Sequence, residues 1–144
     1  MGRVLVRVKL SNHADLALKR AKVLKGEVRT VMADALVDTG ATRLYLKTSI
    51  IRRLGLHRMG AVRSQTTNGI RRSAVYDSVH LELMGRSGNF DVVEVDESVP
   101  NLLGQIPLEY LDFVVDSRTR KLRPNPEHGG HWMAEEYIIR PSNA

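Results

Sequence analysis

Residues 59–96 limit the fold more than any other part of the chain, because they form short apolar runs separated by turn residues. Asn68 and Gly69 lie between two such runs and predict a two-residue hairpin turn of type I′, in which both residues take a positive φ. The sequence GRSGN at 85–89 predicts the next turn, between SVHLELM and FDVVEV. Short strands joined by tight turns predict a mostly β fold.

The N-terminal part of the chain predicts one strand and one helix. Residues 4–10 alternate apolar with other side chains, which is the pattern of a half-buried strand, and Ser11-Asn12 predicts a turn. We expect Asp15 to cap a short helix that continues to about Leu24 and is stopped by Gly26. The apolar side of this helix would consist of Leu16, Ala17, Ala21 and Leu24.

Two further strands and a second helix are expected before residue 59. Residues 28–37 predict one strand, and residues 42–46 predict a second, shorter one. Thr48 or Ser49 would cap the helix that follows, and Gly55 would end it.

The C-terminal part of the chain predicts a third short helix at 107–111, with its proline early, and a strand at 113–115. After Leu122 the composition changes, and Pro, Gly and His become frequent. The apolar residues from Met133 to Ile139 would either dock on the body or on a partner subunit, or form a flexible end.

Composition and charge narrow the class of protein. The 144 residues suit one domain with its own core, and the absence of cysteine excludes disulfides and thiolate chemistry and suits the cytoplasm. Residues 1–10 mix Arg and Lys with apolar residues, so we expect neither a signal peptide nor a membrane-spanning segment. The net charge is +6, but the basic residues are scattered and Phe and Trp are scarce, so we expect no nucleic-acid partner.

One apolar run ends in Asp38-Thr39-Gly40, where the chain is expected to turn. A carboxylate in this place is either a turn residue that accepts hydrogen bonds from backbone N–H groups or an acid–base group on a rigid strand end. The tripeptide alone is weak evidence, because its residues are common. Its context is more specific, since three motifs follow one another: LVDTGA at 36–41, TTNGI at 66–70 and NLLG at 101–104.

These ordered motifs resemble those of the retropepsin-like aspartic proteases, the family of the retroviral proteases and their bacterial and cellular relatives. The resemblance covers about residues 28–123. It implies a closed β barrel of the acid-protease fold with two or three short helices, active as a symmetric homodimer. The apolar-apolar-Gly segment would cross behind the Asp-Thr-Gly loop, and no metal or other cofactor is implied.

The chemistry of peptide hydrolysis explains why a second carboxylate is needed. One carboxylate takes a proton from water, and a second, protonated one polarises the carbonyl. Two carboxyl groups about 3 Å apart share one proton, because ionising both would place like charges side by side. By the resemblance, the catalytic residues are Asp38, Thr39 and Gly40; Gly40 would allow close backbone approach, and the Thr39 hydroxyl would bond across to the partner.

The chain supplies only one such aspartate. The nearest copy is Val114-Val115-Asp116-Ser117, in which Arg118 replaces the glycine that the turn needs. We therefore interpret Asp116 as a turn or strand-end residue. An active pair then requires Asp38 from each of two chains, which predicts a homodimer.

The resemblance also implies that the hairpin around Asn68 closes over an extended peptide and excludes water. The substrate would lie as an added strand, with its side chains in pockets. Without the resemblance, residues 68–70 would be an ordinary exposed hairpin and Leu102 a plain core residue. The residues expected to contact substrate are Ala41, Asn68, Gly69, Ile70 and Leu102.

The sequence departs from the viral pattern at one pair of positions. Viral members carry an Asp soon after the Asp-Thr-Gly-Ala motif and an Arg just after the apolar-apolar-Gly segment, and the two pair. This chain has Thr42 or Arg43 at the first position and Gln105 at the second. Because both partners are missing together, we expect the dimer to be supported differently.

Two other candidate sites have simpler interpretations. His128-Gly-Gly-His131, together with Glu127, offers metal ligands, but the two glycines hold the pair loosely, and a loop is the better interpretation. Ser87 lacks the spacing of a nucleophile elbow and is interpreted as a turn residue.

The sequence thus predicts an aspartic endopeptidase domain at 1–123 and a C-terminal extension at 124–144, acting as a homodimer on peptide or protein substrates. The main alternative has the same fold and dimer but an inactive aspartate pair, and it binds extended peptides without cutting them. A basic nucleic-acid binder is a third hypothesis, and it predicts affinity that falls steeply with salt.

Overall fold

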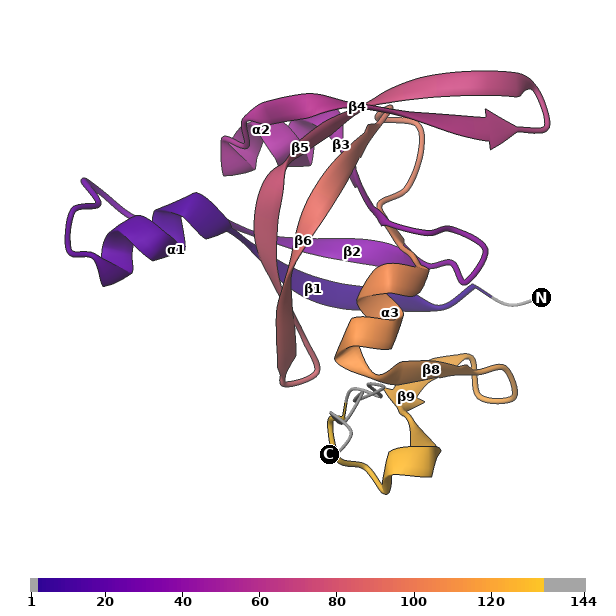
Figure 1. The fold of residues 1–144 in the computed structure, drawn as a ribbon. Coiled ribbons are helices and arrows are strands. Elements are labelled where there is room, and N and C mark those ends of the chain that lie inside the picture. Colours follow the sequence, from indigo (N-terminus) through magenta and orange to yellow (C-terminus); the bar gives the residue numbers. More distant parts are fainter. Residues whose placement is uncertain (1–2, 134–144) are drawn as a thin grey trace, which may run out of the picture.

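The computed structural model describes residues 3–133 and consists mainly of β-strands (Figure 1). In chain order the elements are β1 (Leu5–Asn12), α1 (His13–Arg20), β2 (Thr30–Val37), β3 (Leu44–Lys47), α2 (Thr48–Leu54), β4 (Arg58–Thr66), β5 (Gly69–Leu83), β6 (Arg86–Val95), β7 (Leu102–Leu103), α3 (Gln105–Leu111), β8 (Phe113–Asp116), β9 (Lys121–Pro124) and the 3₁₀ helix η1 (Pro126–His128). The prediction of a mostly β fold with two or three short helices is confirmed for this part of the chain. None of its helices is long and apolar enough to cross a membrane.

Seven strands form one mixed sheet in the order β1-β2-β7-β3-β6-β5-β4. Strand β1 pairs with β2 along one edge and with β5 along the other, so the hydrogen-bonded order returns to its first strand. The short strand β7 lies between β2, to which it is parallel, and β3, to which it is antiparallel. Strands β8 and β9 form a separate pair next to α3 (Figure 1).

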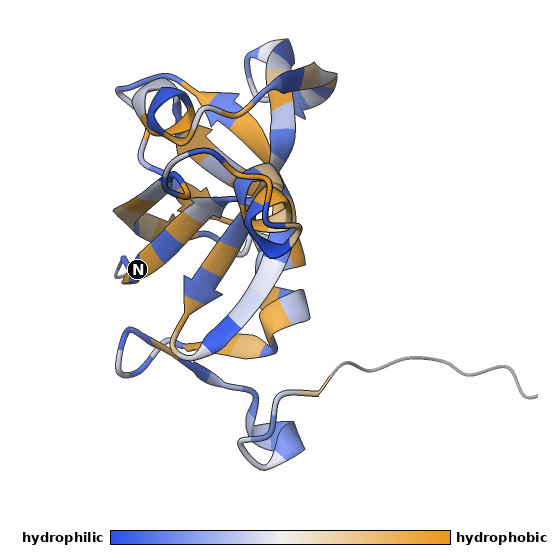
Figure 2. Ribbon diagram, turned by 90° about the vertical axis from the view of Figure 1, so that its left-hand side faces the viewer, coloured by the Kyte–Doolittle hydropathy of each residue, from blue (hydrophilic) through white to orange (hydrophobic). Residues whose placement is uncertain are grey.

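The core lies on one face of the large sheet. Strand β1 buries Val8 and Leu10, as its alternating sequence predicts, and α2 covers the core with Ile51 and Leu54. Figure 2 shows the same alternation as hydrophobic and hydrophilic bands along the strands. Each fully buried aliphatic side chain stabilises the fold by about 2 kcal/mol. The other large apolar side chains with almost no exposure are Leu44, Leu46, Leu81, Leu103 and Leu111.

The first helix differs from the prediction in its cap and its length. Ser11 and Asn12 continue β1 instead of forming a turn, and the Asn12 side-chain oxygen caps α1 by accepting the Asp15 N–H at 3.0 Å. Asn12 suits this role because its amide also donates to the Leu54 carbonyl at 2.8 Å, which fixes the side chain. The helix ends at Arg20, and on the predicted apolar side Ala17 and Ala21 are exposed while Leu16 and Leu24 are half-buried.

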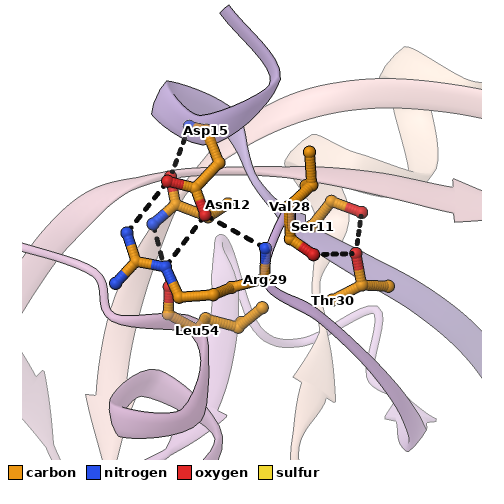
Figure 3. Close-up of polar contacts among 7 residues, drawn as sticks. All are labelled: Ser11, Asn12, Asp15, Val28, Arg29, Thr30 and Leu54. Atoms are coloured by element: carbon orange, nitrogen blue, oxygen red, sulfur yellow. Dashed lines mark hydrogen bonds and ion pairs between the residues drawn. The ribbon is translucent and has the colours of Figure 1, made fainter. Parts of the chain in front are cut away.

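Asp15, which we expected as the cap, instead uses its buried carboxylate to form an ion pair with the half-exposed side chain of Arg29, just before β2 (Figure 3). Arg29 donates from Nε at 2.8 Å, from Nη2 at 2.9 Å and from its backbone N–H at 3.0 Å. These hydrogen bonds hold the pKa of Asp15 below its usual value, although burial acts in the opposite direction. The pair therefore fastens α1 to the sheet.

The second helix ends where predicted, at Gly55, but it begins at Thr48, earlier than predicted, and is capped from a distance. Its N-cap residue, Lys47, makes no side-chain capping bond, and neither Thr48 nor Ser49 acts as the cap. The Glu97 carboxylate accepts the Ser49 N–H instead, and it also accepts the Ser49 hydroxyl at 3.0 Å. A carboxylate at this place satisfies an N–H group that the helix itself leaves free.

The β4–β5 hairpin is present, but its turn differs from the prediction. The turn residues are Thr67 and Asn68, and Gly69 is already paired with Thr66. Only Gly69 has a positive φ, of 109°, whereas a type I′ turn at Asn68-Gly69 would require it at both residues. The prediction of a type I′ turn here is therefore wrong.

The next hairpin turns one residue earlier than predicted. Met84 and Gly85 form the turn with φ values of 51° and 80°, the signs that a type I′ turn needs. Residues 86–89 consequently belong to β6. Ser87 pairs with Glu82 in the sheet, so our interpretation of Ser87 as a turn residue is wrong.

The chain after β7 follows the prediction more closely. Helix α3 starts two residues before the predicted 107 and ends at Leu111, and β8 follows it directly. Asp116 ends β8, and its carboxylate accepts the backbone N–H groups of Arg118 and Thr119 and pairs with Arg123. The interpretation of Asp116 as a strand-end residue is thereby confirmed.

The boundary that we set between residues 123 and 124 falls inside β9. The described part of the extension contacts the body through His128, whose Nδ1 lies 2.6 Å from Oδ2 of the buried Asp112. Burial raises the pKa of Asp112, but hydrogen bonds from His128 and the Met133 N–H more than offset this and hold it below its usual value. The apolar residues 137–139 lie outside the described residues, so their docking remains a prediction.

Candidate active site

Asp38 lies at the end of β2, in the loop that leads to β3. Its backbone N–H donates to the Leu103 carbonyl at 3.0 Å, and its own carbonyl accepts the Ala41 N–H at 3.1 Å. Its carboxylate oxygen Oδ1 accepts the Gly40 N–H at 2.9 Å. Both the backbone and the side chain of Asp38 are therefore fixed by their neighbours.

The same loop presents its functional groups outward. Asp38 is half-buried, whereas Thr39 and Gly40 are exposed. Within residues 3–133, neither Asp38 Oδ2 nor the Thr39 hydroxyl has a hydrogen-bond partner. One carboxylate oxygen and one hydroxyl thus remain accessible to a substrate or to a second subunit.

Strand β7 supports the loop from behind. Leu102 and Leu103 lie between the end of β2 and the start of β3, so the apolar-apolar-Gly segment crosses behind the Asp-Thr-Gly loop, as the resemblance implies. Leu103 is fully buried, and its carbonyl receives the Asp38 N–H. Leu102 is only half-buried and faces away from the core.

The loop is also fastened to the start of α3 by three backbone hydrogen bonds. Gly104, Gln105 and Ile106 donate to the carbonyls of residues 43, 41 and 42 at 2.9, 2.8 and 2.9 Å. This approach requires a glycine, because a Cβ atom on Gly104 would lie 2.4 Å from the Arg43 oxygen and 2.7 Å from the Ala41 oxygen. Ala41, expected to contact substrate, is thus also part of this attachment.

The viral type of Asp–Arg pair is absent from the described residues around the Asp38 loop. Among the described residues, neither Thr42 nor Arg43 forms an ion pair, and the Gln105 side chain donates to Glu109 of its own helix at 2.7 Å. The loop and α3 are therefore held together by main-chain contacts.

Asn101 is a positioning residue that the sequence analysis did not single out. Its buried side chain donates to the Asp34 carbonyl of β2 at 3.0 Å and accepts the Lys47 N–H of β3 at 2.9 Å. Its backbone carbonyl also accepts the Leu36 N–H at 2.8 Å. One amide thus connects the two strands that carry the Asp38 loop, and its only signal in the sequence is its place before Leu102.

Asp38 shares a face of the sheet with a row of apolar side chains. Directly paired residues have their side chains on the same face, and so do residues two apart along a strand. Leu36, two residues before Asp38, therefore starts a row that crosses the sheet on the face opposite the core. The pairs that make up this row are Leu36–Leu102, Leu102–Tyr45, Tyr45–Val93 and Val93–Val75.

The tip of the β4–β5 hairpin carries Asn68, Gly69 and Ile70, all exposed, and Ile70 is 73% exposed. In Figure 1 this tip and the loop between β2 and β3 extend toward the same side of the molecule. Thr66 stabilises the turn, because its hydroxyl donates to the Gly69 carbonyl at 2.9 Å and accepts the Asn68 N–H at 3.2 Å.

An open, mostly apolar groove borders Asp38 and Thr39. Its walls come from the start of β1, the end of β2, α3 and β8. The residues that line it besides Asp38 and Thr39 are Val4, Val37, Gln105, Leu108, Phe113, Val114, Val115 and Ser117.

The His-rich segment does not form a metal site with the residues described. His128 belongs to η1 and its ring contacts Asp112. Within residues 3–133, no group of three or more His, Asp or Glu side chains is arranged to hold a metal ion.

A mostly β fold, an Asp-Thr-Gly loop at a strand end and an apolar-apolar-Gly strand behind it together define the class of retropepsin-like aspartyl proteases. A family model described as aspartyl protease matches residues 21–105, more than half of the chain. The chain therefore belongs to this aspartyl protease family. A search of curated proteins found no match.

Proposed function

We propose that the protein is an aspartic endopeptidase in which Asp38 from each subunit of a homodimer forms the catalytic pair. The observation that carries this proposal is the fixed, outward-facing Asp38 carboxylate at the end of β2. Membership of the aspartyl protease family supports protease activity. Thr39 and Gly40 complete the catalytic loop.

The two carboxyl groups would act on one water molecule. With about 3 Å between them they hold a single proton, and the pair then titrates with two apparent pKa values. The water molecule attacks the peptide carbonyl while the ionised carboxylate takes a proton from it, and the protonated carboxyl group polarises the carbonyl oxygen. The proton then passes to the leaving amine, so the pair ends in its starting state.

A second subunit is required because the chain offers one suitable loop. Asp116, the nearest copy, is committed to the turn after β8 and to Arg123. The apolar groove beside Asp38 supports this assembly, since an exposed apolar surface next to an incomplete site is suited to a protein partner. We further propose that the large sheet is a closed barrel, because β1 pairs with both β2 and β5.

The β4–β5 hairpin would close over the substrate. The peptide would lie as an extended strand between this hairpin and the Asp38 loop, in contact with Ala41, Asn68, Gly69, Ile70 and Leu102. The half-buried position of Leu102 on the Asp38 face supports a role as a pocket wall.

We divide the chain into a catalytic unit at 1–123 and an extension at 124–144. The extension carries no residue of the proposed site. The hydrogen bonds between its described part and the body, such as that of His128 with Asp112, do not involve the Asp38 loop, so we assign it no step of the reaction.

The decisive experiment measures cleavage of an unfolded protein between acidic and neutral pH. We expect the purified chain to cut it and the Asp38→Asn variant to be at least about a hundredfold slower, as expected when one acid–base group is removed. Activity that survives in this variant would exclude the mechanism. Binding of extended peptides with no cleavage by either protein would favour the alternative of an inactive peptide-binding dimer.

A further inference from the structure

The β4–β5 hairpin is strongly basic. Between Arg58 and Tyr76 it contains four arginines and no acidic residue. The four differ in the face of the hairpin on which they lie, and only one of them shares a face with Asp38.

Strand register identifies that residue. On β5, Val75, Ser73 and Arg71 are two residues apart, so Arg71 continues the apolar row that begins at Leu36 beside Asp38. Its partner across the hairpin is Ser64. The register of the hairpin is regular from Ala61 to Thr66, so the assignment of faces holds to the tip.

The neighbouring Arg72 lies on the opposite face. It pairs directly with Arg63, and both share a face with Tyr76, which packs against the core. Arg71 and Arg72 are therefore adjacent, equally charged and exposed, but only Arg71 is on the substrate side of the hairpin.

Arg71 has no committed partner among the described residues. It makes no hydrogen bond or ion pair with residues 3–133. Arg71 also interacts electrostatically with Asp96, whose pKa is lowered mainly by hydrogen bonds from Ser98 and least by Arg71. The guanidinium thus retains all its donors for a carboxylate, which it can bind in a bidentate manner.

We propose that Arg71 selects substrates that carry an acidic side chain on each side of the scissile bond. This inference rests on the proposed function, because it places the peptide between the hairpin and Asp38. The twofold symmetry of the homodimer would bring one Arg71 to each half of the peptide. Apolar substrate residues would occupy the row formed by Leu36, Leu102 and Tyr45.

A peptide fits this surface better than a nucleic acid. Nucleic-acid affinity depends on several cations that contact successive phosphates. Here one arginine continues a row of apolar side chains, and the other three arginines of the hairpin lie on its opposite face.

Two decapeptide libraries test the proposal. Both contain random residues, but four alternate positions are held as Glu in one and as Gln in the other. Binding is measured with the Asp38→Asn protein, which retains the groove, and cleavage is measured with the unaltered protein. Binding reports on the selection of acidic residues even if no cleavage occurs, so failure of the protease function and failure of this inference are distinguishable.

We expect the Glu library to be bound and cut about tenfold better than the Gln library, because each of the two exposed ion pairs with Arg71 contributes about threefold. This difference should decrease as the salt concentration rises. Arg71→Gln should abolish the preference, and Arg71→Glu should reverse it toward a library with Lys at the fixed positions. Arg72→Gln removes the same charge from the other face and should leave the preference intact.

Three outcomes would overturn the proposal. The first is equal binding of the Glu and Gln libraries, and the second is an equal loss of preference in Arg71→Gln and Arg72→Gln. The third is tighter binding of a single-stranded oligonucleotide than of the Glu library, with that binding lost in Arg71→Gln, because the arginine would then belong to a nucleic-acid surface.

Discussion

Substitution of Gly104 by alanine tests how the Asp38 loop is held. An added Cβ would lie 2.4 Å from the Arg43 carbonyl oxygen and 2.7 Å from that of Ala41, and both contacts are with backbone. Neither atom can rotate away as a side chain would, so the loop must move by more than about half an ångström. Gly104 has φ −92°, which alanine adopts readily, so the effect would be steric and not conformational.

The expected cost follows from the contacts that such a movement breaks. Overpacking costs about 1–3 kcal/mol, and each of the hydrogen bonds between the loop and α3 contributes about 1 kcal/mol. Gly104→Ala should therefore lower the free energy of unfolding by about 3 kcal/mol and the melting temperature by roughly 10 °C. Because the loop carries Asp38, protease activity should fall further than the folded fraction explains.

Gly60→Ala provides the matched control, since a Cβ at Gly60 meets no atom within 4 Å and its φ is not positive. Thermal and urea unfolding of both variants, followed by circular dichroism, measure the difference. If Gly104→Ala is within about 0.5 kcal/mol of Gly60→Ala, the close approach of the loop to α3 does not exist as described.

Two further substitutions test the supports of the fold. Asp15→Asn should cost about 1–2 kcal/mol at neutral pH, because the buried Asp15 carboxylate loses its ion pair with the half-exposed Arg29, whereas the exposed Asp34→Asn should cost under about 0.5 kcal/mol. The pKa of Asp15 is lowered in the folded state, so the stability that its ionised form contributes is present above about pH 4 and is lost as the pH falls further. Urea unfolding at several pH values should therefore show the unfolding free energies of the wild-type protein and of Asp15→Asn converging in acid. A constant difference between these two free energies down to about pH 2 would contradict the ion pair between Asp15 and Arg29. Asn101→Ala should cost about 2 kcal/mol by the same assay, since it removes two part-buried hydrogen bonds to backbone groups of β2 and β3, and a cost no larger than that of the exposed Asn89→Ala would remove its positioning role.

The sequence predicted those features that depend on residues close together in the chain. The alternation in residues 4–10 and the apolar run before Asp38 each report on one strand, and both strands are present. Gly55 ended α2 as expected, because a left-handed residue after a helix strongly favours glycine.

The features that the sequence did not predict depend on distant residues. Asn12 caps α1 in place of Asp15 because Leu54 fixes its amide and Arg29 occupies the Asp15 carboxylate. Glu97 caps α2 from 48 residues away. Local propensity cannot anticipate a partner that tertiary structure supplies.

The candidate site shows the same division. The Asp-Thr-Gly motif marked the loop, but the need for Gly104 and the role of Asn101 appear only once β2, β3 and β7 lie side by side. The face on which Arg71 lies follows from strand register, which one sequence does not fix in a hairpin whose two faces are both polar.

The most direct test of the shared aspartate pair is a mixing experiment. Wild-type protein at fixed concentration is equilibrated with increasing amounts of Asp38→Asn protein, and the cleavage rate is followed with substrate in excess. If each active site takes one Asp38 from each of two chains, a ninefold excess of the variant should lower the rate to about a tenth, because most wild-type chains are then in mixed pairs. A rate that does not change with added variant would show that a single chain carries the complete site, and would contradict the account.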